Sequence, residues 1–107
     1  MPRPCKRRIC RAFHGDRVFK PRSIPMSALK TVRLELSELE AMRLCDVENH
    51  DQAMAGSRMG VSRGTIQRLL RSGRAKLLQA ILDSSALLIE KGADHEDLYP
   101  NRRRRRA

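Results

Sequence analysis

The sequence is poor in aromatic residues and has no long apolar run. Its 107 residues include no Trp, and only Phe13, Phe19 and Tyr99 carry aromatic rings. Because recognition of unpaired bases relies on stacking against aromatic side chains, single-stranded nucleic acid is a less natural ligand than duplex DNA. No apolar run approaches the roughly 20 residues of a membrane-spanning helix, and the start lacks the apolar segment of a secretory signal. We therefore expect a cytoplasmic protein with no membrane partner.

Cysteine and histidine are also sparse. Three cysteines, an odd number in a chain without an export signal, indicate reduced thiols and not a disulfide framework. Cys5, Cys10 and His14 are spaced more loosely than the paired motifs of structural zinc sites, so we expect no metal or other cofactor. The alternative is a metal- or redox-sensing regulator that uses these three side chains. Catalytic residues do not gather in a cleft-like context, so we expect neither an enzyme nor a small-molecule substrate.

The charge is strongly basic. With 23 Lys+Arg against 12 Asp+Glu, the formal net charge is +11, which favours a polyanionic partner. The length suits one domain with tails. We expect a basic extended arm over 1–24, a folded domain over 25–91 and a disordered Arg-rich tail over 92–107.

A stretch in the middle of the chain predicts a helix-turn-helix. A helix over 51–58 ends at the turn 59–61, because Gly60 accepts the left-handed backbone conformation that a sharp turn requires. Ser62 stands where its side-chain oxygen can cap the recognition helix, which we place at 62–82. The residues expected to build the turn and its core are Gly56, Gly60, Val61, Ile66 and Leu69.

The recognition helix has two faces, because residues three and four apart lie on one side of a helix. Its predicted buried stripe contains Ile66, Leu69, Leu70, Gly73, Leu77, Ala80 and Ile81. The opposite face is basic and carries no acid, so its first turns suit base edges in the major groove. The predicted base contacts are Ser62, Arg63, Gly64, Gln67 and Arg68. The predicted phosphate contacts are Arg58, Arg71, Arg74 and Lys76.

A third helix precedes this corner. Ser37-x-x-Glu40 has the pattern of a capping box and predicts a helix over 37–47. Five of the 12 acids gather in and just after this helix, and phosphate would repel them, so we expect the segment to lie away from DNA: Glu38, Glu40, Asp46, Glu48 and Asp51.

The strand signals are weaker. Thr31–Leu36 alternates apolar and charged residues with the period of a strand, and Ala86–Glu90 is its candidate partner. The two would form a small two-stranded β ribbon; helical extension through Leu87-Leu88 is the alternative. The fold class is therefore mainly α, a three-to-four-helix domain with disordered basic termini. Either the region 31–47 or a second copy of the chain must cover the far end of the apolar stripe, and the second copy would give a homodimer.

Two family resemblances involve these segments. Residues 52–82 are similar to the fourth region of bacterial sigma factors, in which a turn, Ser, Thr-Ile/Val and Arg-Ala-Arg/Lys-Lys-Leu follow in this order. Residues 1 to about 91 resemble the uncharacterised prokaryotic protein family 0251, with its domain of unknown function. The segments that carry this resemblance are MPRP, FKP, IP, LELSELEAMRLCDVE, MGVSRGTIQRLL and ALLIE. It implies a sigma-like DNA-binding fold with no established activity.

The sequence therefore predicts a nucleoid-associated protein that regulates transcription by reading double-stranded DNA. The chain leaves no room for the polymerase-binding and promoter-melting regions of a full sigma factor. The alternative is an RNA-binding or ribosome-associated basic protein, which would bind structured RNA equally well.

Overall fold

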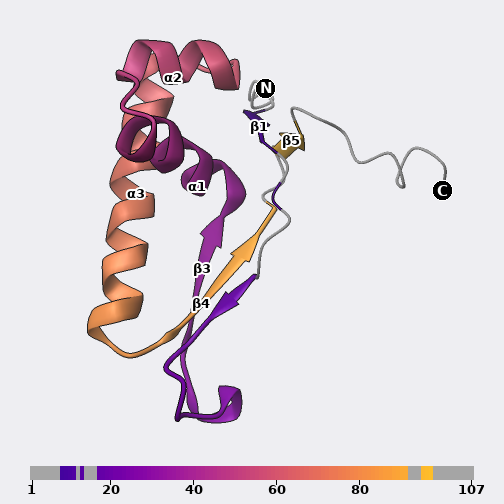
Figure 1. The fold of residues 1–107 in the computed structure, drawn as a ribbon, viewed down its shortest axis with the longest axis vertical. Helices are drawn as coiled ribbons and strands as arrows, with labels where there is room; N and C mark the ends of the chain where they lie inside the picture. The colour runs from indigo at the N-terminus through magenta and orange to yellow at the C-terminus, as the bar shows by residue number, and fades with distance from the viewer. Residues whose placement is uncertain (1–7, 12, 14–16, 92–94, 98–107) are drawn as a thin grey trace, which may run out of the picture.

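The computed structural model describes residues 8–11, 13, 17–91 and 95–97. Three helices pack beside a small mixed sheet; the upper part of the long helix lies beside the two shorter helices, and its lower part lies beside the sheet (Figure 1). In chain order the elements are β1 (Arg8–Cys10), β2 (Val18–Phe19), η1 (Met26–Ala28), β3 (Thr31–Glu35), α1 (Leu36–Met42), η2 (Arg43–Val47), α2 (Gln52–Met59), α3 (Arg63–Leu82), β4 (Ala86–Glu90) and β5 (His95–Asp97). No helix within the described ranges is long and apolar enough to span a membrane.

The main sheet has three strands in the order β2-β4-β3. The two predicted strands do pair, but in parallel, with Val32 opposite Leu87 and Leu34 opposite Ile89. Parallel pairing needs a long crossover, which here consists of α1, η2, α2 and α3. The predicted two-stranded ribbon is incomplete, because β2 adds a third strand, antiparallel to β4.

The predicted arm and tail both contribute to the fold. Besides β2, the arm provides β1, which pairs in parallel with β5 from the predicted tail. Cys10 at the end of β1 is fully buried in the core. Within the described residues of the arm, the backbone of β1 and of β2 has pairing partners. The five arginines at 102–106 lie outside the described residues.

The first helix begins one residue before the predicted start and uses another capping box. Glu35 is the N-cap, its side chain accepts from the Glu38 backbone N–H, and the Glu38 carboxylate accepts from the Glu35 N–H at 2.9 Å. Ser37 and Glu40 therefore do not form the predicted box. Glu40 instead accepts hydrogen bonds from the Arg43 guanidinium, at 2.8 and 2.9 Å. The helical path continues through η2 to Val47, as predicted.

The core lies between α3, α1 and the inner face of the sheet. Leu34 and Ile89 reach it from the strands, and Ile66 and Leu70 from α3. The helices approach closely at Gly73, where an added Cβ would lie 3.1 Å from Met42 Cε. This packing places α3 so that its start meets α2 and its end reaches the sheet.

Candidate nucleic-acid interface

The corner between α2 and α3 has the glycine turn and the serine cap that the sequence predicted. Gly60 adopts a left-handed φ of 70°, and the Val61 N–H donates to Gly56 O at 2.9 Å. A Cβ on Gly56 would lie 2.7 Å from Val61 O, so only glycine fits this crossing. Ser62 caps α3, because its hydroxyl oxygen accepts from the Thr65 N–H at 3.1 Å.

Buried side chains hold this corner together. Ile66 is fully buried, Leu69 is buried beside it, and Val61 packs against them in a half-buried position. Ile9 of β1 also covers the turn, since a Cβ on Gly60 would lie 3.3 Å from Ile9 Cδ1. No pattern in the sequence predicts this last contact, because Ile9 lies in a basic segment without periodicity. The corner is therefore packed against the core on one side and against Ile9 of β1 on the other.

The outer face at the start of α3 is exposed and basic. Gln67, Arg68 and Arg71 are exposed, and Arg68 Nη2 donates to Thr65 Oγ1 at 3.1 Å. This hydrogen bond to a neighbour one turn back holds the guanidinium over the first turns of the helix. Within the described part of the chain, Arg58, Arg63 and Arg71 have no ion-pair partner. Their charge is therefore available to an anionic ligand.

The other residues of the predicted base-reading set are less suited to that role. The Ser62 hydroxyl already accepts from the Thr65 N–H and hydrogen-bonds the Thr65 hydroxyl, so its capacity is used within the protein. Gly64 is half-buried and offers only backbone, although an added Cβ would make an ordinary van der Waals contact, with the nearest atom, Ser62 Oγ, at 3.8 Å. Both residues thus shape the face without supplying a free side-chain donor.

Two of the predicted phosphate contacts, Arg74 and Lys76, form ion pairs with carboxylates. Arg74 Nη2 lies 2.6 Å from Asp46 Oδ1, and this pair raises the pKa of the guanidinium. Lys76 Nζ donates to Glu38 Oε1 at 2.8 Å, and Glu38 is buried and also accepts from the Ser72 hydroxyl. A buried carboxylate needs such partners. These two ion pairs join α3 to the acidic segment. The prediction missed them because the carboxylates lie 28 and 38 residues away in the sequence.

The acidic segment lies closer to the corner than expected. Asp46 and Asp51 share a polar hollow of about 590 Å³ with Arg63, Arg74 and His50. The carboxylates therefore border one side of the basic face, at the very start of α3. These carboxylates would repel an anionic ligand least at Gln67, Arg68 and Arg71. The part of the basic face best suited to an anion therefore lies about one turn further along α3 than Arg63.

Of the three candidate metal ligands, Cys10 is the one that the structure describes. Cys10 is fully buried, and burial together with the nearby Glu40 charge raises the pKa of its thiol to about 12. The thiol is then protonated at neutral pH, whereas metals bind the thiolate. Cys5 and His14 lie outside the described residues. No group of three or more potential metal ligands occurs among the residues that are described.

Comparison with known proteins identifies the family. The family described as "Protein of unknown function DUF134" matches residues 1–98. The chain belongs to this family. It is 45% identical over 92 residues to a UPF0251 protein of Pelotomaculum thermopropionicum, covering 86% of this chain and 70% of the relative. The UPF0251 protein Rru_A1194 of Rhodospirillum rubrum is 39% identical over 112 aligned positions, which cover 99% of this chain and 78% of that protein.

Other members are comparably similar. The UPF0251 protein DehaBAV1_0135 of Dehalococcoides mccartyi is 41% identical over 100 residues, covering 94% of this chain and 86% of its own length. No solved structure matches the chain. The expected resemblance to the uncharacterised protein family 0251 is thus confirmed, and the family name assigns no activity.

Proposed function

We propose that this protein binds double-stranded DNA through the α2–α3 corner and regulates transcription. The observation that carries the proposal is the exposed face of α3, where Gln67, Arg68 and Arg71 lie next to a rigid turn and have no carboxylate partner in the described chain. The net charge of +11 supports a polyanionic ligand. Two helices that meet at a short glycine turn, with the second one exposed, suit docking in a major groove.

The chemistry of this face suits base reading. Arginine forms bidentate hydrogen bonds with guanine, and glutamine does so with adenine, each discriminating by about 1–3 kcal/mol. Arg58 at the end of α2 and Arg71 further along α3 then lie where they would bind phosphates on either side. Arg63 is placed less favourably, because carboxylates share its hollow.

The proposal is tested by selecting a preferred site from a random duplex library and measuring affinity by fluorescence anisotropy. We expect Arg68→Ala to weaken binding to the selected site by about 1–3 kcal/mol and binding to random duplex by much less. Arg22→Ala is the matched control: it also removes one exposed arginine, from the segment between β2 and β3 at the opposite end of the molecule from α2 (Figure 1). Equal losses for the two variants would contradict base reading by α3.

Structured RNA provides the competing ligand. The deep, narrow major groove of A-form RNA does not admit a helix, so we expect a hairpin RNA to compete poorly for the protein. A hairpin that competes as strongly as the selected duplex would favour the RNA-binding alternative.

A further inference from the structure

The last two turns of α3 carry an exposed apolar surface. Leu77 and Leu78 are 36% and 57% exposed, and Ile81 and Leu82 are 67% and 77% exposed. The sequence assigned Leu77 and Ile81 to the buried stripe, but α1 packs on the helix earlier, at Gly73, and leaves this end uncovered. Four large apolar side chains on two turns, with no charge from 77 to 82, form what we call the apolar ridge.

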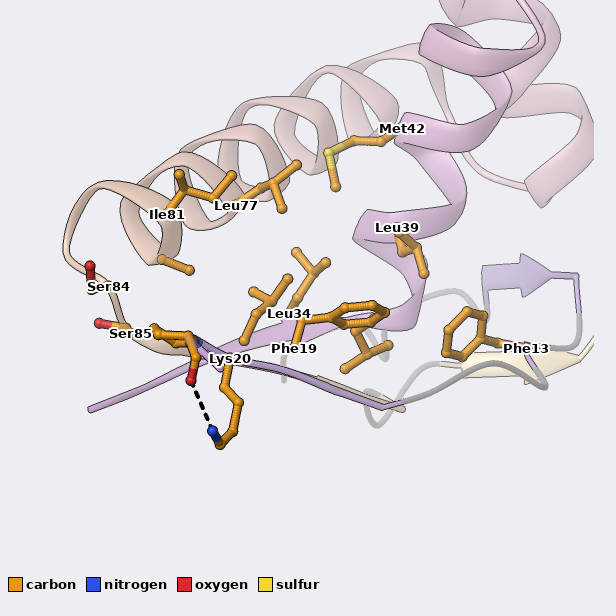
Figure 2. A pocket seen from close by; sticks show the side chains of 14 residues that line it. Phe13, Phe19, Lys20, Leu34, Leu39, Met42, Leu77, Ile81, Ser84 and Ser85 are labelled. Carbon is orange, nitrogen blue, oxygen red and sulfur yellow. Dashed lines mark hydrogen bonds between the residues drawn. The ribbon is translucent and has the colours of Figure 1, made fainter. Parts of the chain in front are cut away.

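A hollow lies directly beside this ridge. It has a volume of about 550 Å³, and its described lining comes from α3, α1, the sheet and Phe13. Figure 2 shows Leu77 and Ile81 pointing into it from above, opposite Leu34 and Phe19 of the sheet, with Phe13 and Leu39 at one end. Ridge and hollow therefore share Leu77 and Ile81 and form one continuous surface.

The part of this surface that the structure describes has almost no charge. Among the described lining residues Lys20 is the one that is charged, and its ammonium points away from the apolar side chains and donates to Pro21 O at 2.8 Å (Figure 2). Ser84 and Ser85 lie at the same edge. In a chain with a net charge of +11, two copies repel each other least where both surfaces are uncharged.

We propose that this surface binds a second copy of the chain, so that the ridge of each copy enters the hollow of the other in a two-fold dimer. A two-fold interface requires a self-complementary surface, and a protrusion beside a hollow of the same apolar chemistry meets that requirement. A small molecule in the hollow would leave Leu78 and Leu82 exposed. The five consecutive arginines at 102–106 are chemically unsuited to burial against an apolar surface.

The proposal does not depend on DNA binding. Arg68 and Ile81 are thirteen residues apart on one helix, which at 1.5 Å per residue separates them by about 20 Å. The dimer therefore leaves the α2–α3 corner free, and either proposal can fail without the other.

The oligomeric state of the full chain tests the dimer. Nuclease-treated protein, free of nucleic acid, is measured by sedimentation equilibrium up to about 100 µM, a range in which a micromolar interface is populated. We expect twice the chain mass of 12.3 kDa, and no loss of the dimer at high salt, because apolar contacts are not screened. A protein that stays monomeric throughout this range would overturn the proposal. The same holds if the surface binds only an added apolar ligand or a different protein and never a second copy of the chain.

Substitutions locate the interface. We expect Ile81→Glu and Leu82→Glu each to weaken dimerisation at least about 30-fold, because a buried carboxylate would have no partner. Both residues are exposed in the single chain, so circular dichroism and thermal unfolding should show an intact fold. Val47→Glu is the matched control, since Val47 is also an exposed apolar residue, 72% accessible, at the end of η2. A dimer that survives in both ridge variants, or that is lost equally in the control, would contradict this interface.

Discussion

The two halves of α3 present different chemistry to solvent. From Arg63 to Arg71 the exposed side chains are cations and an amide, whereas from Leu77 to Leu82 they are apolar except for Gln79. Between them, Arg74 and Lys76 neutralise carboxylates of the preceding helical segment. One helix thus carries a polar surface, an internally paired section and an apolar surface, one after the other.

The contrast is one of position along the helix and not of helix face. Steps of three and four residues keep side chains on one side, and such steps link Arg68, Arg71, Leu78 and Leu82 through Ala75. The same side therefore changes from basic to apolar along its length. A helical wheel, which projects all turns onto one plane, hides this change.

The largest expected effect comes from removing the same side chain in each half. Ile66→Ala should lower the free energy of unfolding by about 2–5 kcal/mol, because Ile66 is fully buried in the corner. Ile81→Ala should lower it by less than about 1 kcal/mol in dilute protein, since Ile81 is mostly exposed. Urea unfolding measures both. Similar losses would mean that the two halves are packed alike.

In the middle of α3, stability should depend on the ion pair that Lys76 forms with Glu38. Lys76→Ala leaves the buried Glu38 carboxylate without its cation, and we expect a loss of about 1–3 kcal/mol, reduced from the value for fully buried pairs because Lys76 is partly exposed. Arg74→Ala breaks an exposed pair and should cost at most about 1 kcal/mol. Thermal unfolding at matched pH distinguishes them. Equal shifts in Tm would contradict the role of Glu38 in joining α1 to α3.

A smaller effect is expected on the salt dependence of DNA binding, which should differ between an arginine without a carboxylate partner and one in an ion pair. Arg71→Ala should flatten the logarithmic salt dependence of binding by about 0.9, the contribution of one phosphate contact. Arg74→Ala should leave the slope nearly unchanged, because Asp46 already neutralises that charge. Anisotropy titrations at several salt concentrations give both slopes. A larger change for Arg74 would restore the phosphate role that its sequence position predicted.

The turns at the two ends of α3 provide the smallest contrast. Ser84 adopts a left-handed φ of 52° without being glycine, and the Ser85 N–H donates to Ala80 O at 2.9 Å to end the helix. Ser84→Gly should therefore stabilise the fold by about 0.5–1 kcal/mol, whereas Gly60→Ser should destabilise it at the other turn. Unfolding midpoints check the signs, and a destabilised Ser84→Gly protein would refute this account of the turn.

Local signals made the corner predictable. Gly60, Ser62 and the spacing of Ile66 and Leu69 act within a few residues, so a single sequence contains them. The first helix shows where local signals become ambiguous. Ser37-x-x-Glu40 and Glu35-x-x-Glu38 both have capping-box spacing, and the structure uses the second while Leu36 is buried in the core.

Contacts between distant segments were not predictable. Arg74 and Lys76 find their carboxylates 28 and 38 residues away, so nothing near them in the sequence reveals that their charge is used. Strand β2 is only two residues long, and it is defined by its backbone pairing with β4 and not by a pattern in its own sequence. Likewise, the exposure of Leu77 and Ile81 depends on where α1 stops covering the helix, which periodicity does not specify.

The most direct test of DNA binding by the first half of α3 is an amide chemical-shift map of the labelled protein titrated with its selected duplex. We expect saturable shifts at Arg58 and from Ser62 to Arg71, and little change in β3, β4 or the residues from Leu77 to Leu82. Shifts that concentrate on the sheet or the apolar ridge, or that never saturate with duplex, would contradict recognition by the start of α3.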